Sequence, residues 1–145
     1  MIRHEWFCGN KIPQEIFCIR TKVFVNEQNV PLERERIDEE DAKATHLLLY
    51  LDEKPVATGR ILVINNKYTL GRIAVLKGYR GRGFGKLATK LLTQKCFEMG
   101  AHEVVLSSQY HAKDFYEQLG FAPCSEIYMD ANIEHISMKI KKGRV

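Results

Sequence analysis

The chain has 145 residues, of which 45% are hydrophobic, 28% charged and 10% aromatic, and its formal net charge is +4 at pH 7. This length and apolar content predict one folded domain over residues 1–145 and exclude collagen-like, low-complexity and disordered classes. Charges within the first seven positions argue against a signal peptide, and no apolar stretch is long enough to span a membrane. We therefore expect a cytoplasmic protein with no membrane partner.

The first half of the chain predicts a strand, a helix and a three-stranded meander. A strand is expected over 2–7, and Pro13 opens a helix whose apolar face carries Ile16, Ile19, Val23 and Phe24. The acidic segment Glu33 to Asp41 has no apolar periodicity, which predicts a loop or a short solvated helix. The meander strands are expected over 46–51, 56–64 and 68–75, with a tight turn at Asn65-Asn66.

The second half predicts a parallel crossover. A basic, glycine-punctuated loop over 76–85 leads into a helix that ends at Gly100, and a short buried strand follows over 103–107. A second helix is expected over 112–119, and two closing strands over 121–129 and 134–140. The apolar stripe of the first of these helices consists of Phe84, Leu87, Ala88, Leu91, Leu92 and Met99.

The cysteines and histidines give no sign of a metal centre. The four cysteines are widely spaced, with no Cys-x-x-Cys, and no two histidines lie at helical spacing. We expect the cysteines to be unpaired and buried as small apolar residues, and we expect no metal.

The loop from Lys77 to Lys86 is the most informative segment of the sequence. Its alternating glycines let backbone amides turn toward one point, and the helix that follows adds unsatisfied N-terminal amides and the positive end of its dipole. Arg80, Arg82 and Lys86 add positive charge around these amides. The loop is therefore predicted to bind a phosphate or pyrophosphate.

Three known motifs do not fit this loop. A P-loop requires glycine where Arg80 stands and a hydroxyl residue where Leu87 stands, and a dinucleotide fingerprint requires glycine in place of Lys86. A match to an RNA-recognition motif breaks at Lys86 and lacks the aromatic residue at Thr89.

The pattern that fits is Arg80-x-x-Gly83-x-Gly85, placed after a strand and opening a helix. It resembles the acyl-CoA loop of the GNAT superfamily of N-acetyltransferases. Downstream, residues 112–121 resemble the family's helix that carries Phe-Tyr and ends in Gly-Phe, and residues 23–31 with the acidic run after them resemble a small bacterial branch typified by the ElaA protein. The order of elements is similar to the GNAT fold over nearly the whole chain. The resemblance implies an α/β domain whose mixed central sheet is splayed between the fourth and fifth strands, with helices on both faces.

The resemblance also implies how acetyl-CoA would bind as a co-substrate. Backbone groups of Ile73, Ala74 and Val75 would pair with the pantetheine amides, and the pyrophosphate would lie on loop amides. Gln109 is a further candidate contact for the pantetheine or adenosine end. The loop residues concerned are Arg80, Gly81, Arg82, Gly83, Phe84, Gly85 and Lys86.

The catalytic groups are implied less completely. Tyr116 matches the residue that protonates the leaving thiolate in the family, and a strand amide near Val75 would stabilise the oxyanion. Gly71 stands where many relatives carry a carboxylate that serves as the general base. Glu27 is our candidate for the base, and His46 is a second.

The sequence thus predicts an acetyl-CoA-dependent N-acetyltransferase that moves an acetyl group directly to a primary amine of a small molecule or a peptide. A CoA-binding sensor without catalysis is the alternative, because Gly71 removes the usual base. A nucleic-acid module is disfavoured, because acidic residues nearly balance the basic ones outside the loop. The sequence leaves open whether the protein forms a homodimer.

Overall fold

A computed structural model describes residues 1–9, 11–30 and 39–143. One mixed sheet runs through it, in the order β1-β2-β3-β4-β5-β8-β6, and β7 pairs with β8. Its longer strands are β1 (Ile2–Cys8), β2 (Thr45–Leu51), β3 (Lys54–Ile64), β4 (Lys67–Val75), β5 (Glu103–Gln109) and β8 (Ile133–Lys141). Two short strands, β6 (Ala122–Pro123) and β7 (Tyr128–Asp130), complete it.

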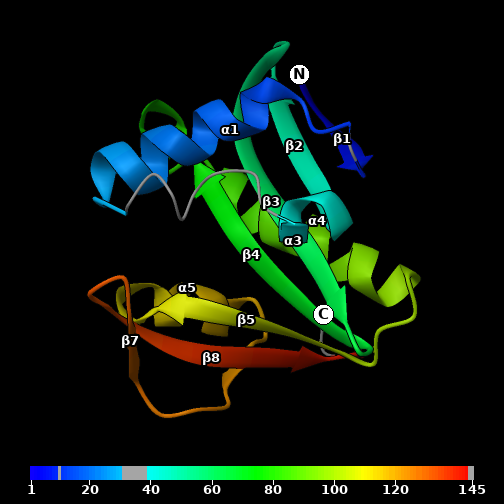
Figure 1. The fold of residues 1–145 in the computed structure, drawn as a ribbon, viewed down its shortest axis with the longest axis vertical. Coiled ribbons are helices and arrows are strands. Elements are labelled where there is room, and N and C mark those ends of the chain that lie inside the picture. The colour runs from blue at the N-terminus through cyan, green and yellow to red at the C-terminus, as the bar shows by residue number, and fades with distance from the viewer. Residues whose placement is uncertain (10, 31–38, 144–145) are drawn as a thin grey trace.

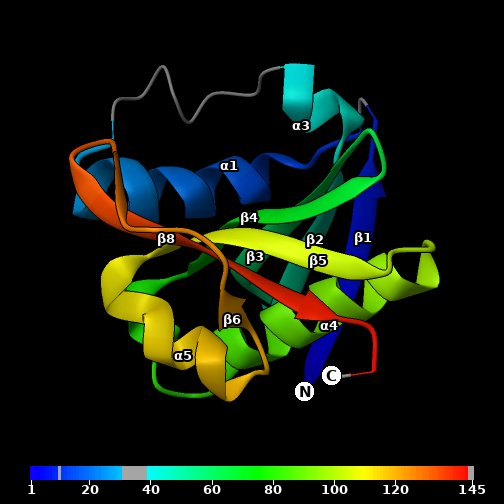
Figure 2. The same cartoon turned by 90° about the horizontal axis from the view of Figure 1, so that it is seen from below.

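Helices cover both faces of the sheet (Figure 2). On one face lie α1 (Gln14–Arg20), the π-helical segment η1 (Thr21–Glu27) that continues it, and α3 (Glu39–Lys43). On the other face lie α4 (Phe84–Glu98) and α5 (Lys113–Gln118). The short 3-10 turns η2 (Lys77–Tyr79) and η3 (Tyr110–Ala112) precede α4 and α5. The predicted α/β fold with helices on both faces is confirmed.

Each face of the sheet has its own apolar core. Ile16, Ile19 and Val23 pack against Leu48 and Tyr50 on the face covered by α1. The larger core lies under α4, where Ala88, Leu92 and Cys96 meet the central strands. The predicted apolar faces of both helices therefore point inward, with the exception of Met99, which is 40% exposed because it caps the end of α4.

The predicted hairpins form where the sequence placed them. Asn65 and Asn66 both have positive φ, as a tight turn between β3 and β4 requires, and Asp52 and Glu53 form a second turn of this kind between β2 and β3. The strand predicted over 121–129 is wrong. It is broken into β6 and β7, because Pro123 offers no amide and the Ser125 hydroxyl, in place of a backbone carbonyl, accepts the amide of Ser137 on β8 at 2.9 Å.

Two further expectations need correction. All four cysteines are unpaired as predicted, but only Cys96 is buried, and Cys8, Cys18 and Cys124 are exposed. The acidic run is not simply solvated: residues 31–38 lie outside the described part, while Asp41 in α3 is fully buried. Its carboxylate binds Arg20 at 2.9 and 3.3 Å and Arg60 at 2.6 Å, which ties α3 to α1 and to β3.

Candidate active site

The parallel pair β4 and β5 separates after three residues of pairing. Tyr68–Leu70 pair with Val104–Leu106, and beyond them the two strands diverge (Figure 1). The predicted splay between the fourth and fifth strands is therefore confirmed. Among the described residues, 71–75 therefore have no strand partner on the side of β5.

A β-bulge lies in β4 at the point where the strands part. Arg60 pairs with Gly71 and Thr58 with Ala74, so Arg72 and Ile73 together lie opposite the single residue Gly59. Arg72 has φ of +52°, a conformation rarely adopted by residues with a side chain. Such bulges re-aim side chains near functional sites, and this one brings Arg72 and Ile73 to the opening.

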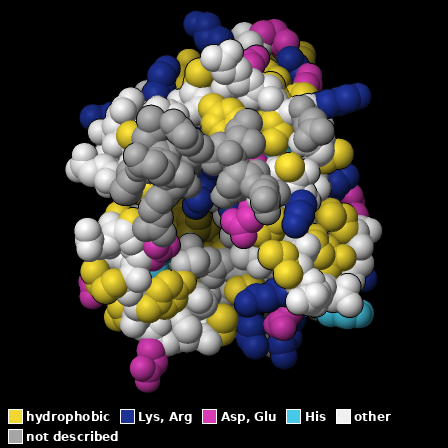
Figure 3. Space-filling model, viewed as in Figure 1, with side chains coloured by type: hydrophobic (Ala, Val, Ile, Leu, Met, Phe, Trp, Pro, Cys, Tyr) yellow, Lys and Arg dark blue, Asp and Glu magenta, His cyan; other side chains and the backbone are white. Residues whose placement is uncertain are grey.

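A cavity of about 270 Å³ occupies the opening, and this face of the molecule is hollowed at its centre (Figure 3). Phe24 and Gln28 line it from η1 and the residue after it, while Ala112 and Tyr116 line it from η3 and α5 on the opposite face of the sheet. The cavity is therefore lined by residues from elements on both faces of the sheet. Its remaining lining residues are Leu70, Gly71, Arg72, Ile73, Leu106, Ser107, Gln109, Asp130 and His135.

The glycine-rich loop lies between the end of β4 and α4. Gly81 and Gly83 have φ of +78° and +86°, and a side chain built at either would meet nothing within 4 Å. Gly83 caps α4, so the first amides of that helix point away from the helix body. Phe84 is buried against Tyr79, whereas Arg82 and Lys86 are exposed.

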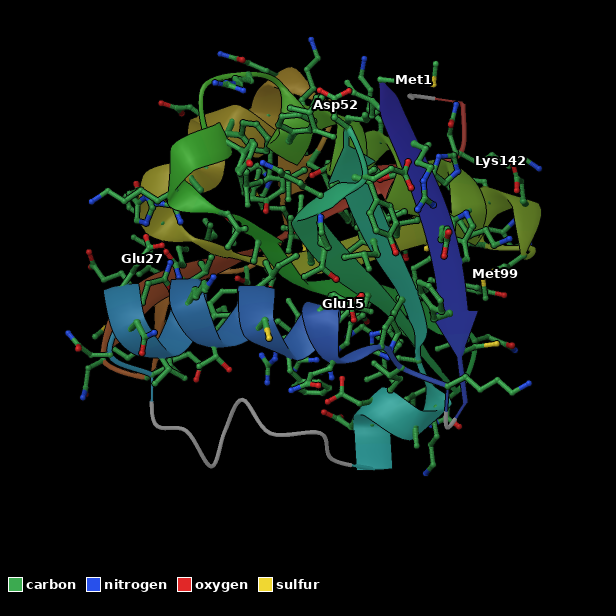
Figure 4. All side chains as sticks on the ribbon, turned by 90° about the horizontal axis from the view of Figure 1, so that it is seen from above. Met1, Glu15, Glu27, Asp52, Met99 and Lys142 are labelled. Carbon is green, nitrogen blue, oxygen red and sulfur yellow. The ribbon has the colours of Figure 1, made fainter. Side chains whose placement is uncertain are left out.

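Arg80 and Glu27 are brought together, which the sequence did not predict. The Arg80 guanidinium donates to the Val75 carbonyl at 3.0 Å and binds both carboxylate oxygens of Glu27, at 2.7 and 3.0 Å. Figure 4 shows Glu27 at the far end of the helical segment from Glu15. The ion pair joins the end of η1 to the end of β4. We had expected the Arg80 side chain to bind the pyrophosphate, but here it binds Glu27 and the Val75 carbonyl.

Tyr116 enters the cavity from α5 with its ring held between two phenylalanines. The ring centroids of Phe115 and Phe121 lie 5.1 and 6.0 Å away, both in edge-on geometry. Burial raises the pKa of Tyr116 to about 12. The hydroxyl therefore keeps its proton throughout the neutral pH range. A general acid must be protonated in this way before negative charge develops on the leaving group.

A chain of side-chain hydrogen bonds crosses the mouth of the cavity. The Gln109 amide donates to Gln28 at 2.6 Å, and its carbonyl oxygen lies 2.7 Å from Nε2 of His111. Gln109 thus lines the cavity, and its contact with CoA stays a prediction. In this structure its amide holds the residue after η1 to the end of β5.

The second candidate base, His46, lies away from the cavity. It is 1% exposed on β2, and its Nε2 donates to the Asp41 carbonyl at 2.9 Å. Burial, aided by the charges of Arg20 and Arg60, lowers the pKa of His46 below its ordinary value, although Asp41 opposes this. His46 is part of the buried cluster around Asp41.

Among the polar residues of the cavity that sequence reasoning missed, Arg72, Asp130 and His135 are the ones with charged or titratable side chains. They belong to a bulge, a three-residue strand and the last strand, and their meeting depends on strand register. Asn132, a residue type that favours tight turns, is a local signal for the hairpin beside Asp130, and both Ala131 and Asn132 have positive φ. Within the described ranges, no three potential ligands gather into a metal site, and no helix is long and apolar enough to cross a membrane.

Comparison with known proteins places this geometry in a family. Residues 10–142 match the family described as acetyltransferase (GNAT) domain. The uncharacterized N-acetyltransferase YjcF of Bacillus subtilis is 39% identical over 126 residues, which cover 86% of this chain and 89% of that protein. Protein ElaA of Escherichia coli is 32% identical over 124 residues, or 83% of this chain and 81% of ElaA.

Solved structures agree with the sequence comparison. The crystal structure of Escherichia coli ElaA superposes with a TM-score of 0.86 at 27% identity and covers 97% of this chain and 100% of that one. An acyl-CoA N-acyltransferase from Pseudomonas aeruginosa gives a TM-score of 0.85 at 25% identity, over 97% of this chain and 99% of that one. The protein therefore belongs to the GNAT acetyltransferases, in the ElaA-like branch, and is an acyltransferase.

Proposed function

We propose that the protein transfers an acetyl group directly from acetyl-CoA to a primary amine of a small molecule or a peptide. The observation that carries this proposal is the cavity at the splay of the sheet, because α5 lines it from one face and η1 lines it from the other. Direct transfer requires two ligands to meet at one point, and such a cavity allows it.

The residues around the splay fit acetyl-CoA. The open edge of Ile73, Ala74 and Val75 can pair with the amides of an extended pantetheine arm, as an added strand would. The unobstructed space over Gly81 and Gly83 and the first amides of α4 suit a pyrophosphate. When bound, acetyl-CoA would supply an activated acetyl group near Tyr116.

The ion pair changes what each loop residue does in this proposal. Because the Arg80 side chain is held by Glu27 and Val75, recognition of the pyrophosphate falls to the loop amides, with Arg82 and Lys86 as the exposed cations. Arg80 instead fixes the end of β4 beside the loop.

Tyr116 acts as the general acid. Tyr116 lines the cavity and its hydroxyl is protonated at neutral pH, so it can donate to the thiolate sulfur as that atom leaves. The packing of its ring against Phe115 and Phe121 holds the hydroxyl in place.

A CoA-binding sensor is the second candidate function, and the Glu27 geometry favours it. The carboxylate proposed as the base is held in a two-point ion pair with Arg80, so both of its oxygens are already engaged by the guanidinium. If no other residue accepts the amine proton, the site binds CoA without turnover. We keep the cytoplasmic location, the lack of a nucleic-acid partner and the homodimer as predictions.

Release of CoA thiol in the presence of a panel of primary amines tests the proposal. Turnover with an amine, and product carrying the acetyl group on nitrogen, is the expected result. Binding of acetyl-CoA with no turnover on any amine would favour the sensor. Salt-sensitive binding of DNA or RNA oligomers that displaces CoA would favour a nucleic-acid module instead.

A further inference from the structure

His135 lies at the cavity without a role in the proposal so far. It is 9% exposed on β8, opposite Gln109 in the register of β5 and β8, and its ring stacks on Tyr128 of β7 at 6.0 Å between centroids. It lines the cavity and also the adjoining hollow below η1. The imidazole is thus held on one side by an aromatic ring and presented to the cavity.

One hydrogen bond fixes which nitrogen of His135 carries the proton. Nδ1 lies 2.7 Å from the carbonyl oxygen of Ile133. A carbonyl can only accept, so Nδ1 must donate, and in the neutral ring Nε2 then presents a lone pair. Nε2 makes no hydrogen bond within the described ranges.

The strand places His135 on the acceptor side of the sheet. Along β8, Ile136, Met138 and Ile140 belong to the core that α4 covers. His135 alternates with them and therefore points to the opposite face, where η1 supplies Phe24 to the same cavity. Tyr116 enters from the α5 face, so the two groups approach the cavity from opposite sides of the sheet.

We infer that Nε2 of His135 is the general base that deprotonates the acceptor amine, an inference that rests on the proposed N-acetyltransferase function. An alkylammonium cannot attack a carbonyl until it has lost a proton, and a base on the side away from the leaving sulfur is the one the acceptor meets first. The other candidates are engaged elsewhere: Glu27 with Arg80, His46 with the Asp41 carbonyl and His111 with Gln109.

The groups already described account for every proton that moves during the reaction. Nε2 takes one proton from the ammonium and later releases it to solvent. The amine nitrogen then forms its bond to the acetyl carbon as the carbon–sulfur bond breaks. The sulfur takes a proton from Tyr116, and the second proton lost by nitrogen restores the tyrosine through solvent.

Several charged or titratable groups surround His135 and enter the pH dependence. Tyr128 and Asp130 lie near it on β7 and Arg72 on β4, Tyr116 lines the same cavity from α5, and Glu134 precedes it on β8. Asp130 is a carboxylate at the same cavity, so Asp130→Asn is the comparison that separates it from His135 as the base.

The variant His135→Asn tests the assignment. Its side-chain amide can still donate to the Ile133 carbonyl, but nothing replaces Nε2. With an alkylamine from the panel, kcat at pH 7 should fall about a hundredfold or more, and higher pH should restore part of it because more of the amine is then neutral. With methoxyamine, which is already neutral at pH 7, kcat should change little. Thermal stabilisation by acetyl-CoA should also be unchanged, and the exposed His102→Asn variant should behave as the parent with both amines.

Each other outcome has a definite meaning. Equal losses with both amines would assign His135 to structure, and a large selective loss in Asp130→Asn with none in His135→Asn would move the base to Asp130. Failure of the parent to turn over any amine would reject the proposed function itself. Nitrogen NMR of the imidazole needs no turnover: the proton is expected on Nδ1 of His135, and a proton on Nε2 would overturn the inference.

Discussion

Tyr116 lines the cavity, and its ring packs edge-on against Phe115 and Phe121. Tyr116→Phe keeps the ring and removes only the proton donor. We expect kcat to fall about a hundredfold or more where chemistry limits the rate, with the KM for acetyl-CoA and the stability little changed. Steady-state kinetics with the best amine of the panel measures this. An undiminished kcat would leave Tyr116 a packing residue and give protonation of the sulfur to water.

Substitutions at Gly83 test whether the glycine-rich loop binds the pyrophosphate. Its φ of +86° penalises any side chain, but Asn and Asp tolerate this region better than other residues and are nearly identical in shape. Gly83→Asp should abolish stabilisation by acetyl-CoA because a carboxylate repels the pyrophosphate, while Gly83→Asn should retain part of it.

Thermal denaturation measures the difference between these two variants. For the parent, acetyl-CoA at about a hundred times its Kd adds about 2.7 kcal/mol to stability. Equal stabilisation of the Asp variant and the parent would remove the loop from the binding site.

At the scale of elements, Gly59 allows the bulged strand β4 and helix α4 to pack closely. A Cβ at Gly59 would lie 2.5 Å from Cδ1 of Leu92 and 3.3 Å from Cγ1 of Ile73. Gly59→Ala should therefore cost about 1–3 kcal/mol of stability by overpacking. Gly78→Ala is the control, since a Cβ there meets nothing within 4 Å. Urea unfolding compares them, and equal stability of the two variants would show that Leu92 moves aside freely.

The buried carboxylate of Asp41 anchors α3 to α1 and to β3. Burial alone would raise the pKa of Asp41, but its hydrogen bonds and ion pairs with Arg20 and Arg60 outweigh burial and hold the pKa below the ordinary value. Its contribution to stability is therefore complete above the ordinary carboxyl pKa and is lost as the pH falls through the lowered value.

Asp41→Asn should cost about 3–5 kcal/mol at pH 7, because it removes the buried negative charge that pairs with Arg20 and Arg60, and the cost should shrink in acid. Denaturant unfolding at neutral and acidic pH measures both effects. Asp52→Asn, at an exposed turn where the carboxylate meets the N-terminal ammonium, should change stability little. A pH-independent cost at Asp41 would contradict the ion-pair account.

Local patterns predicted those elements whose conformation depends on nearby residues. The helix faces, the Asn65-Asn66 turn and the loop around Gly83 all have short-range signals, and each is confirmed. The buried role of Asp41 has none, because its partners Arg20 and Arg60 are about twenty positions away on either side.

At the scale of the whole molecule, the site is formed where distant segments meet through the sheet. The proposed acid Tyr116 comes from α5, the loop precedes α4, and His135 comes from the last strand. The family pattern identified Tyr116 and the loop. It could not identify His135, because the pairing of His135 with Gln109 is fixed by the register of β5 and β8.

A structure of the protein with CoA bound tests the central claim most directly. The account predicts the pantetheine arm along Ile73–Val75 in the opening between β4 and β5, the pyrophosphate on the amides of residues 81–86, and the sulfur beside the Tyr116 hydroxyl. Arg80 is expected to keep its contact with the Val75 carbonyl. CoA found instead at the far end of the sheet, in the hollow of about 510 Å³ lined by Tyr68 and His102, would contradict the account.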